Sequence, residues 1–128
     1  MNVEPEVIQT EAAPKAIGPY SQGIALADWV FVSGQIPLDP ATGELVRGSF
    51  ADHATRVLTN LDAILHAAGS DRRRVVKVTV YLTDVGRFAE FNEVYATFFG
   101  EHRPARAVVG VTALPRGAQV EIEAVAAR

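Results

Sequence analysis

Apolar residues recur at every second position in some segments of the chain and at every third or fourth position in others. Between residues 75 and 83, apolar residues such as Val78 and Val80 alternate with polar or aromatic ones, which is the spacing of a β-strand with two different faces. Between residues 49 and 68, apolar residues return at helical spacing, at Phe50, Ala54, Val57, Leu58, Leu61, Leu65 and Ala68. Both spacings in one chain predict an α+β fold.

Residues at the ends of the helical segments support their boundaries. Ser49 is a suitable N-cap for the helix over residues 49–68, and Gly69 is suited to end it. A second helix is predicted over residues 86–99, with Asp84 as its cap and a stripe made of Phe88, Phe91, Tyr95 and Phe98.

The remaining regular segments are short and typical of strands. They cover residues 7–8, 21–26, 29–32, 105–111 and 119–126, and Ala27-Asp28 forms a hairpin turn between the second and third. The element order is β-β-β-α-β-α-β-β, so two amphipathic helices can cover one face of a single mixed sheet. The other face would carry apolar and polar side chains together, and we expect it to pack against other subunits.

Composition narrows the class of protein. The 128 residues suit one domain, residues 1–128, and the hydrophobic fraction of 48% is high enough for a packed core. There is no cysteine, which excludes disulfides and thiolate metal sites. A net charge of -3 disfavours nucleic acid as a partner. The N-terminus does not resemble a signal peptide and no apolar run is long enough to span a membrane, so we expect a cytoplasmic protein.

Several residues that often carry chemistry have ordinary structural interpretations here. His53 and His66 lie thirteen positions apart on one helix and point in different directions, and His102 follows the second helix, so we expect no metal site. The basic run over residues 72–74 fits a solvated turn better than a phosphate or RNA contact. No glycine-rich phosphate loop is present.

Small and aromatic residues at strand ends are more unusual. Tyr20 stands at a turn before a strand, and Ser33-Gly34 ends another strand with small residues that expose backbone N–H groups. Each has a structural alternative: Tyr20 as a lid on the core, and Ser33-Gly34 as a simple turn.

Charged residues on the last two strands are the other candidates. Arg106 begins an apolar strand, and Glu121 and Glu123 share one face of the final strand. Arginine grips a carboxylate through two parallel hydrogen bonds, and a nearby carboxylate can orient and deprotonate a water. The structural alternative is an ion pair between Arg106 and one of the two glutamates.

These residues lie in segments that resemble the RidA (YjgF) family, in the same order and over nearly the whole chain. The segments are Ala16-Ile17-Gly18-Pro19-Tyr20-Ser21-Gln22, Val32-Ser33-Gly34-Gln35-Ile36-Pro37, and residues 88–95, 104–106 and 120–124. The resemblance implies a chorismate-mutase-like fold and a homotrimer with a central barrel. It also implies a ligand cleft at each subunit interface.

The resemblance further implies an enzyme that hydrolyses reactive enamines and imines, such as 2-aminoacrylate, 2-iminopropanoate and 2-iminobutanoate, to 2-keto acids and ammonia without a cofactor. Matched by position, Arg106 would grip the substrate carboxylate and Glu121 would help hold the attacking water. The remaining substrate-binding positions would be Tyr20, Ser33, Gly34 and Asn92.

Two departures from the family pattern lie at the expected cleft wall and bear on substrate preference. Val108 stands where the family often has cysteine, and the loop before Pro104 is shorter than usual. Three alternatives stay open: a non-catalytic sensor of small acids or an interaction protein, a translation inhibitor with endoribonuclease activity, and a chorismate mutase. The acidic balance disfavours the second, and a single cleft arginine disfavours the third.

Overall fold

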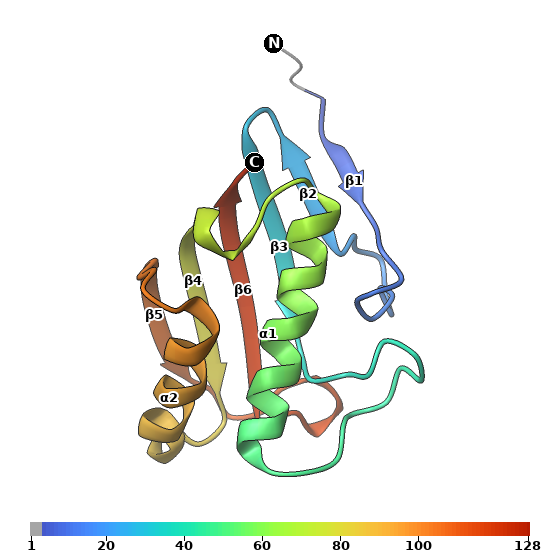
Figure 1. The fold of residues 1–128 in the computed structure, drawn as a ribbon. Coiled ribbons are helices and arrows are strands. Elements are labelled where there is room, and N and C mark those ends of the chain that lie inside the picture. The colour runs from blue at the N-terminus through green and yellow to red at the C-terminus, as the bar shows by residue number, and fades with distance from the viewer. Residues whose placement is uncertain (1–3) are drawn as a thin grey trace.

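A computed structural model describes residues 4–128, and in it a six-stranded sheet carries two helices on one face (Figure 1). The helices are α1 (Phe50–Ala67) and α2 (Phe88–Phe99). The strands are β1 (Glu6–Ile8), β2 (Gly23–Leu26), β3 (Trp29–Gln35), β4 (Val75–Leu82), β5 (Ala105–Gly110) and β6 (Val120–Ala127). The predicted element order and mixed α+β class are confirmed.

The strands stand in the order β1-β2-β3-β6-β4-β5, so the C-terminal strand lies in the middle of the sheet. Only β4 and β5 pair in parallel, and α2 connects them; the other neighbours are antiparallel. Figure 1 shows α1 crossing in front of β6 and β3, with α2 in front of β4 and β5. The two helices thus cover the same face of the sheet.

The ends of α1 follow from local chemistry. The Ser49 hydroxyl accepts a hydrogen bond from the backbone N–H of Asp52, and the Asp52 carboxylate accepts one from the backbone N–H of Ser49. Such a capping box satisfies two donors that the first helical turn leaves free, and a cap of this kind contributes about 1 kcal/mol. Gly69, just past the helix, has φ of +80°, which glycine adopts without steric cost.

One sheet face forms the core and the other is open. The core face of β6 carries Val120, Ile122, Ala124 and Ala126, all buried against the helices. On the open face Val7, Ile24, Phe31 and Val125 stand side by side across β1, β2, β3 and β6. Phe31 is 46% exposed and Val7 61% exposed. A row of apolar side chains in water is characteristic of a surface that another molecule covers.

The structure differs from the sequence-based boundaries at two places that matter for the site. β3 continues past Val32 to Gln35 through a bulge, in which residues 33–34 oppose a single residue of β6. β2 begins at Gly23 rather than at residue 21, because its pairing with β3 ends at Val32, where the bulge begins. At the start of α2, Asp84 caps a separate 3-10 turn, Val85–Arg87.

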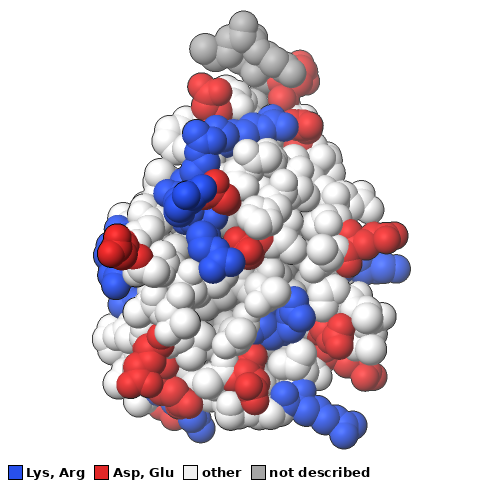
Figure 2. Space-filling model, in the orientation of Figure 1, with Lys and Arg blue, Asp and Glu red and all other residues white. Residues whose placement is uncertain are grey.

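Charges are interspersed on the helix-bearing face. Figure 2 shows basic side chains near the upper end of this face with acidic side chains among and around them. The Arg72 guanidinium pairs with Asp62 at 2.9 Å and donates to the Phe98 carbonyl, so the first arginine of the basic run links the two helices, while Arg73 and Arg74 are exposed as expected for a solvated turn. Within residues 4–128, no helix combines the length and the apolar character needed to cross a bilayer. The N-terminal stretch does not resemble a signal peptide in sequence. Its first residues, 1–3, lie outside the described residues.

Candidate functional site

A cleft of about 430 Å³ lies beside the β3 bulge and the start of β6. It brings together four of the predicted site residues, Tyr20, Ser33, Gly34 and Glu121. Its wall is completed by Pro14, Lys15, Ile17, Gln35, Ile36, Leu38, Pro115 and Glu123. The cleft therefore combines an apolar lining with two carboxylates.

The position of the Glu121 carboxylate depends on the missing side chain at Gly34. A Cβ atom added to Gly34 would lie 2.2 Å from Glu121 Oε2, far inside van der Waals contact. The β3 bulge places this glycine directly beside the carboxylate. Gly34 thus makes room for an acid, which is a different role from the exposed backbone N–H that its sequence position indicated.

The chemistry of Glu121 is shifted toward the neutral acid. Burial raises the pKa of Glu121 above the ordinary carboxyl range, and the negative charge of Glu123 raises this pKa further. A carboxylate with a raised pKa is a better base at neutral pH and is also a usable acid.

The second carboxylate, Glu123, has a fixed neutral partner. The Tyr81 hydroxyl on β4 donates a short hydrogen bond to Glu123 Oε1. This hydrogen bond, together with burial and the negative charges of Glu123 and Glu121, raises the pKa of Tyr81. Tyr81 therefore stays protonated and keeps donating throughout the neutral pH range.

Tyr20 reaches the cleft on a loop that the buried Gln22 side chain holds in place. Gln22 Nε2 donates to the backbone carbonyls of Thr10, Ala13 and Pro14, and Gln22 Oε1 accepts from the N–H of Thr10. Tyr20 itself is 47% exposed. The aromatic ring is thus a partly exposed wall at the mouth of the cleft rather than a lid on the core.

Ser33 lies on the bulge with its polar groups already engaged. The Ser33 hydroxyl donates to the carbonyl of Ser21 at 2.6 Å, and the Ser33 N–H donates to the carbonyl of Gln22. These bonds tie the bulge to the residues just before β2. Ser33 therefore fixes the distance between the loop that carries Tyr20 and the strand that carries Gly34.

The other two predicted site residues, Arg106 and Asn92, form a separate pocket of about 360 Å³ between β5 and α2. Arg106 Nη1 donates to Asn92 Oδ1 at 2.8 Å. The guanidinium carbon also lies 4.7 Å from the centroid of the Tyr95 ring, within the range of a cation–π contact. Arg103 and Pro104 border the same pocket.

Within one chain the two groups of residues lie on opposite faces of the sheet. Arg106 pairs in register with the buried Val78 and contacts α2, so its side chain is on the helix-bearing face. Glu121 alternates with the buried Val120 and Ile122, so its side chain is on the open face. Among the ion pairs of residues 4–128, none joins Arg106 to either glutamate of β6, so the structural alternative of an ion pair does not apply.

The histidines have structural contacts. His102 Nε2 lies 2.7 Å from the carbonyl oxygen of Val75, and His66 lies 3.8 Å from Asp62 on the same helix. In the described part of the chain, no three histidine or acidic side chains come close enough together to hold a metal ion.

Comparison with known proteins places the chain in a family. The family model described as Endoribonuclease L-PSP matches residues 10–128. The crystal structure of the YjgF gene product from E. coli is 45% identical in sequence and superposes with a TM-score of 0.91, covering 96% of this chain and 98% of the other. The chain belongs to the RidA/YjgF family.

Other members of the RidA/YjgF family carry more specific names. A protein of Mus musculus named 2-iminobutanoate/2-iminopropanoate deaminase is 50% identical over 121 residues, which cover 94% of this chain and 90% of that protein. The crystal structure of E. coli TdcF with bound serine is 47% identical with a TM-score of 0.92, covering 96% of this chain and 98% of that chain. The α+β fold expected from the resemblance, a mixed sheet with two helices on one face, is thereby confirmed.

Sequence reasoning gave Gln22, Tyr95 and Tyr81 no role in the site. Gln22 lies in one of the segments that resemble the family, but no neighbouring residue in the sequence indicated that its side-chain amide holds a loop eight to twelve residues away. Tyr95 fits the apolar stripe of α2, so the pattern assigned it to the core, where it is indeed 6% exposed. Tyr81 lies on the polar face of its strand, and the alternation of apolar and polar residues along that strand was the one sequence feature that placed it away from the core.

Proposed function

We propose that this protein hydrolyses 2-imino acids, formed from enamines such as 2-aminoacrylate, to 2-keto acids and ammonia. The observation that carries the proposal is the pairing of a preorganised arginine pocket with a second cleft that holds a carboxylate of raised pKa. The name of the Mus musculus relative and the serine bound by E. coli TdcF support small amino-acid-derived substrates.

Arg106 would bind the substrate carboxylate through its planar fork. Asn92 accepts one guanidinium N–H and the Tyr95 ring packs against the cation, so the side chain is held in one orientation before substrate arrives. Each charge-assisted hydrogen bond to a carboxylate contributes about 1.5–3 kcal/mol. A fixed guanidinium loses little freedom on binding, which is why preorganisation increases affinity.

Glu121 would accept a proton and then return it during the reaction. It takes a proton from water as the water oxygen bonds to the carbon of the protonated imine, and the electron pair of the C=N double bond moves to nitrogen. It then returns that proton to the amine nitrogen, the C–N bond breaks with its electron pair on the departing ammonia, and Glu121 accepts the hydroxyl proton as the keto group forms and releases it to solvent. The raised pKa suits Glu121 to both directions of transfer.

The pocket that contains Arg106 and the cleft that contains Glu121 must come from different copies of the chain. In a 2-imino acid the carboxylate carbon is bonded directly to the imine carbon, so the anion-binding group and the base must lie within one small cleft. In one chain Arg106 and Glu121 lie on opposite sheet faces. The apolar row across the open face offers a surface for a second copy, and we propose a homotrimer with sites between subunits.

The direct test generates 2-aminoacrylate in situ with a pyridoxal-phosphate dehydratase acting on serine. Because imines hydrolyse spontaneously in water, the measured quantity is keto-acid release above the rate without this protein. We expect an increase that is proportional to protein concentration and lost in Arg106→Ala. Pyruvate binding by calorimetry without any increase in rate would instead indicate a sensor of small acids.

A further inference from the structure

The strand face that carries Glu121 holds a second carboxylate in a fixed place. Glu123 lies two residues along β6, and Tyr81 on β4 is the register partner of Glu121. The Tyr81 hydroxyl nevertheless donates to Glu123. The aromatic side chain therefore reaches along the sheet to the farther carboxylate, and its hydrogen bond is directed away from Glu121.

We propose that Tyr81 and Glu123 are positioning residues for imine hydrolysis, an inference that rests on the function proposed above. The phenol holds the Glu123 carboxylate in place beside Glu121, so that a fixed negative charge faces the base while only Glu121 contacts the water. The alternation of β6 puts both glutamates on the same face, and Tyr81 is what makes their roles different.

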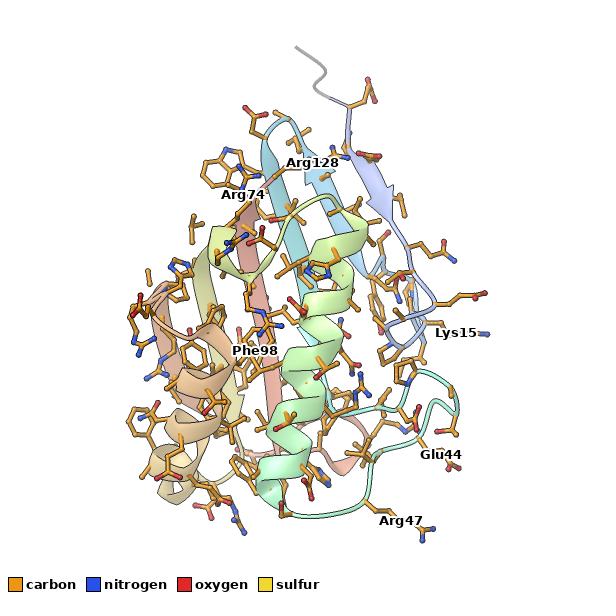
Figure 3. All side chains as sticks on the ribbon, in the orientation of Figure 1. Lys15, Glu44, Arg47, Arg74, Phe98 and Arg128 are labelled. Carbon is orange, nitrogen blue, oxygen red and sulfur yellow. The ribbon has the colours of Figure 1, made fainter. Side chains whose placement is uncertain are left out.

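The charged and titratable groups around Glu121 come from three elements. Glu123 shares its strand, Tyr81 lies on β4, and the loop before β2 brings Lys15 and Tyr20 to the cleft. The β3 residues at the cleft are uncharged. Figure 3 shows the Lys15 side chain extending outward from its loop, away from the sheet. Glu123 is therefore the charge that acts on Glu121 at short range.

This arrangement matters because Glu121 must first accept and then return a proton. Burial raises the pKa of Glu121, and the charge of Glu123 adds to that effect. A base whose pKa lies nearer neutral pH performs both transfers more readily than an ordinary carboxylate does. Without Tyr81, Glu123 would no longer be held beside Glu121, and its effect on the proton transfers of Glu121 would be weakened.

Two substitutions test the pair by kinetics. We expect Tyr81→Phe to lower kcat by about tenfold with little change in KM, the effect of one lost hydrogen bond to a charged group. Glu123→Gln should move the acidic limb of the pH profile to lower pH, because the charge that disfavours ionised Glu121 is gone. Thr79→Val, which removes a hydroxyl from the same face of β4, is the matched control and should leave kcat and the profile unchanged.

A spectroscopic measurement tests the same pair without relying on activity. The side-chain carboxyl carbons of ¹³C-glutamate-labelled protein can be assigned with Glu121→Gln and Glu123→Gln and then titrated by NMR. We expect Glu121 to titrate at lower pH in Glu123→Gln than in the wild type. Identical titration of Glu121 in both proteins, or wild-type kcat and pH profile in Tyr81→Phe and Glu123→Gln, overturns the inference. If the titration shifts but the wild type does not hydrolyse imines, the proposed function fails and the Tyr81–Glu123 effect on Glu121 stands.

Discussion

The pocket around Arg106 and the cleft around Glu121 are built by different means. Arg106 is surrounded by partners: Asn92 accepts its hydrogen bond and Tyr95 packs against its guanidinium. Glu121 occupies a place made by the absence of a side chain, since a Cβ on Gly34 would overlap its carboxylate. One region fixes a cation by contacts, and the other leaves space for an anion.

The difference matches the work proposed for each region. A group that only binds a carboxylate gains from rigidity, because its geometry stays the same from substrate to product. A group that accepts and returns a proton must change its hydrogen-bond partners during the reaction, and at Gly34 there is no side chain to constrain the Glu121 carboxylate. Substitutions that remove one property at a time should therefore affect binding and turnover separately.

Loss of the Arg106 guanidinium should have the largest effect. Arg106→Ala removes two charge-assisted hydrogen bonds of about 1.5–3 kcal/mol each, so we expect kcat/KM to fall by about a thousandfold or more. Arg106→Lys should also be poor, since an ammonium group lacks the planar fork. Keto-acid release is the measurement and Arg74→Ala, on the exposed turn before β4, is the control. Full activity in either Arg106 variant would contradict its assignment.

Loss of the Glu121 carboxylate should affect turnover alone. Glu121→Gln keeps the shape but removes the base, so we expect kcat to fall by about a hundredfold or more while pyruvate affinity by calorimetry is retained. In the wild type, kcat/KM should fall with decreasing pH at a higher pH than an ordinary carboxylate would cause, because burial raises the pKa of Glu121. Loss of pyruvate binding together with turnover would mean that Glu121 mainly holds the site together.

A side chain at position 34 should reproduce part of the fall in kcat that is expected for Glu121→Gln. In Gly34→Ala the new Cβ displaces the Glu121 carboxylate. We expect kcat to fall by about tenfold, because the carboxylate is still present but is no longer held in the position from which it transfers the proton. The control is the double variant with Glu121→Gln, in which Gly34→Ala should cause little further loss. Fully additive losses would show that Gly34 acts independently of Glu121.

Loosening the loop that carries Tyr20 should have the smallest effect on turnover. Gln22→Leu leaves the buried carbonyls of Ala13 and Pro14 without their donor, which costs roughly 1–3 kcal/mol of folding stability. We expect a higher KM with kcat nearly unchanged, because the mouth of the cleft is affected while Glu121 is not. Denaturant unfolding and steady-state kinetics measure the two effects, and Gln9→Leu on the exposed part of the same segment is the control. A change in kcat alone would contradict this role.

The sequence predicted the helices and strands well, but it predicted less well which side chains come together in space. Period and capping located α1 to within one residue at each end, because Ser49, Asp52 and Gly69 act locally. The β3 bulge was not predictable, since it depends on how β3 pairs with β6, which is more than eighty residues away. The same limit hid the separation of Arg106 from Glu121, because alternation along a strand says which residues share a face but not which face of the sheet that is.

The mixing of two inactive variants tests the central claim, that each site joins Arg106 of one subunit to Glu121 of another. Arg106→Ala and Glu121→Gln chains should each be nearly inactive alone. After joint unfolding and refolding in equal amounts, about one interface in four would combine an intact Arg106 with an intact Glu121, so about a quarter of wild-type activity should return. If the mixture is no more active than the separate variants while mass spectrometry shows mixed oligomers, the site does not lie between subunits and the account is wrong.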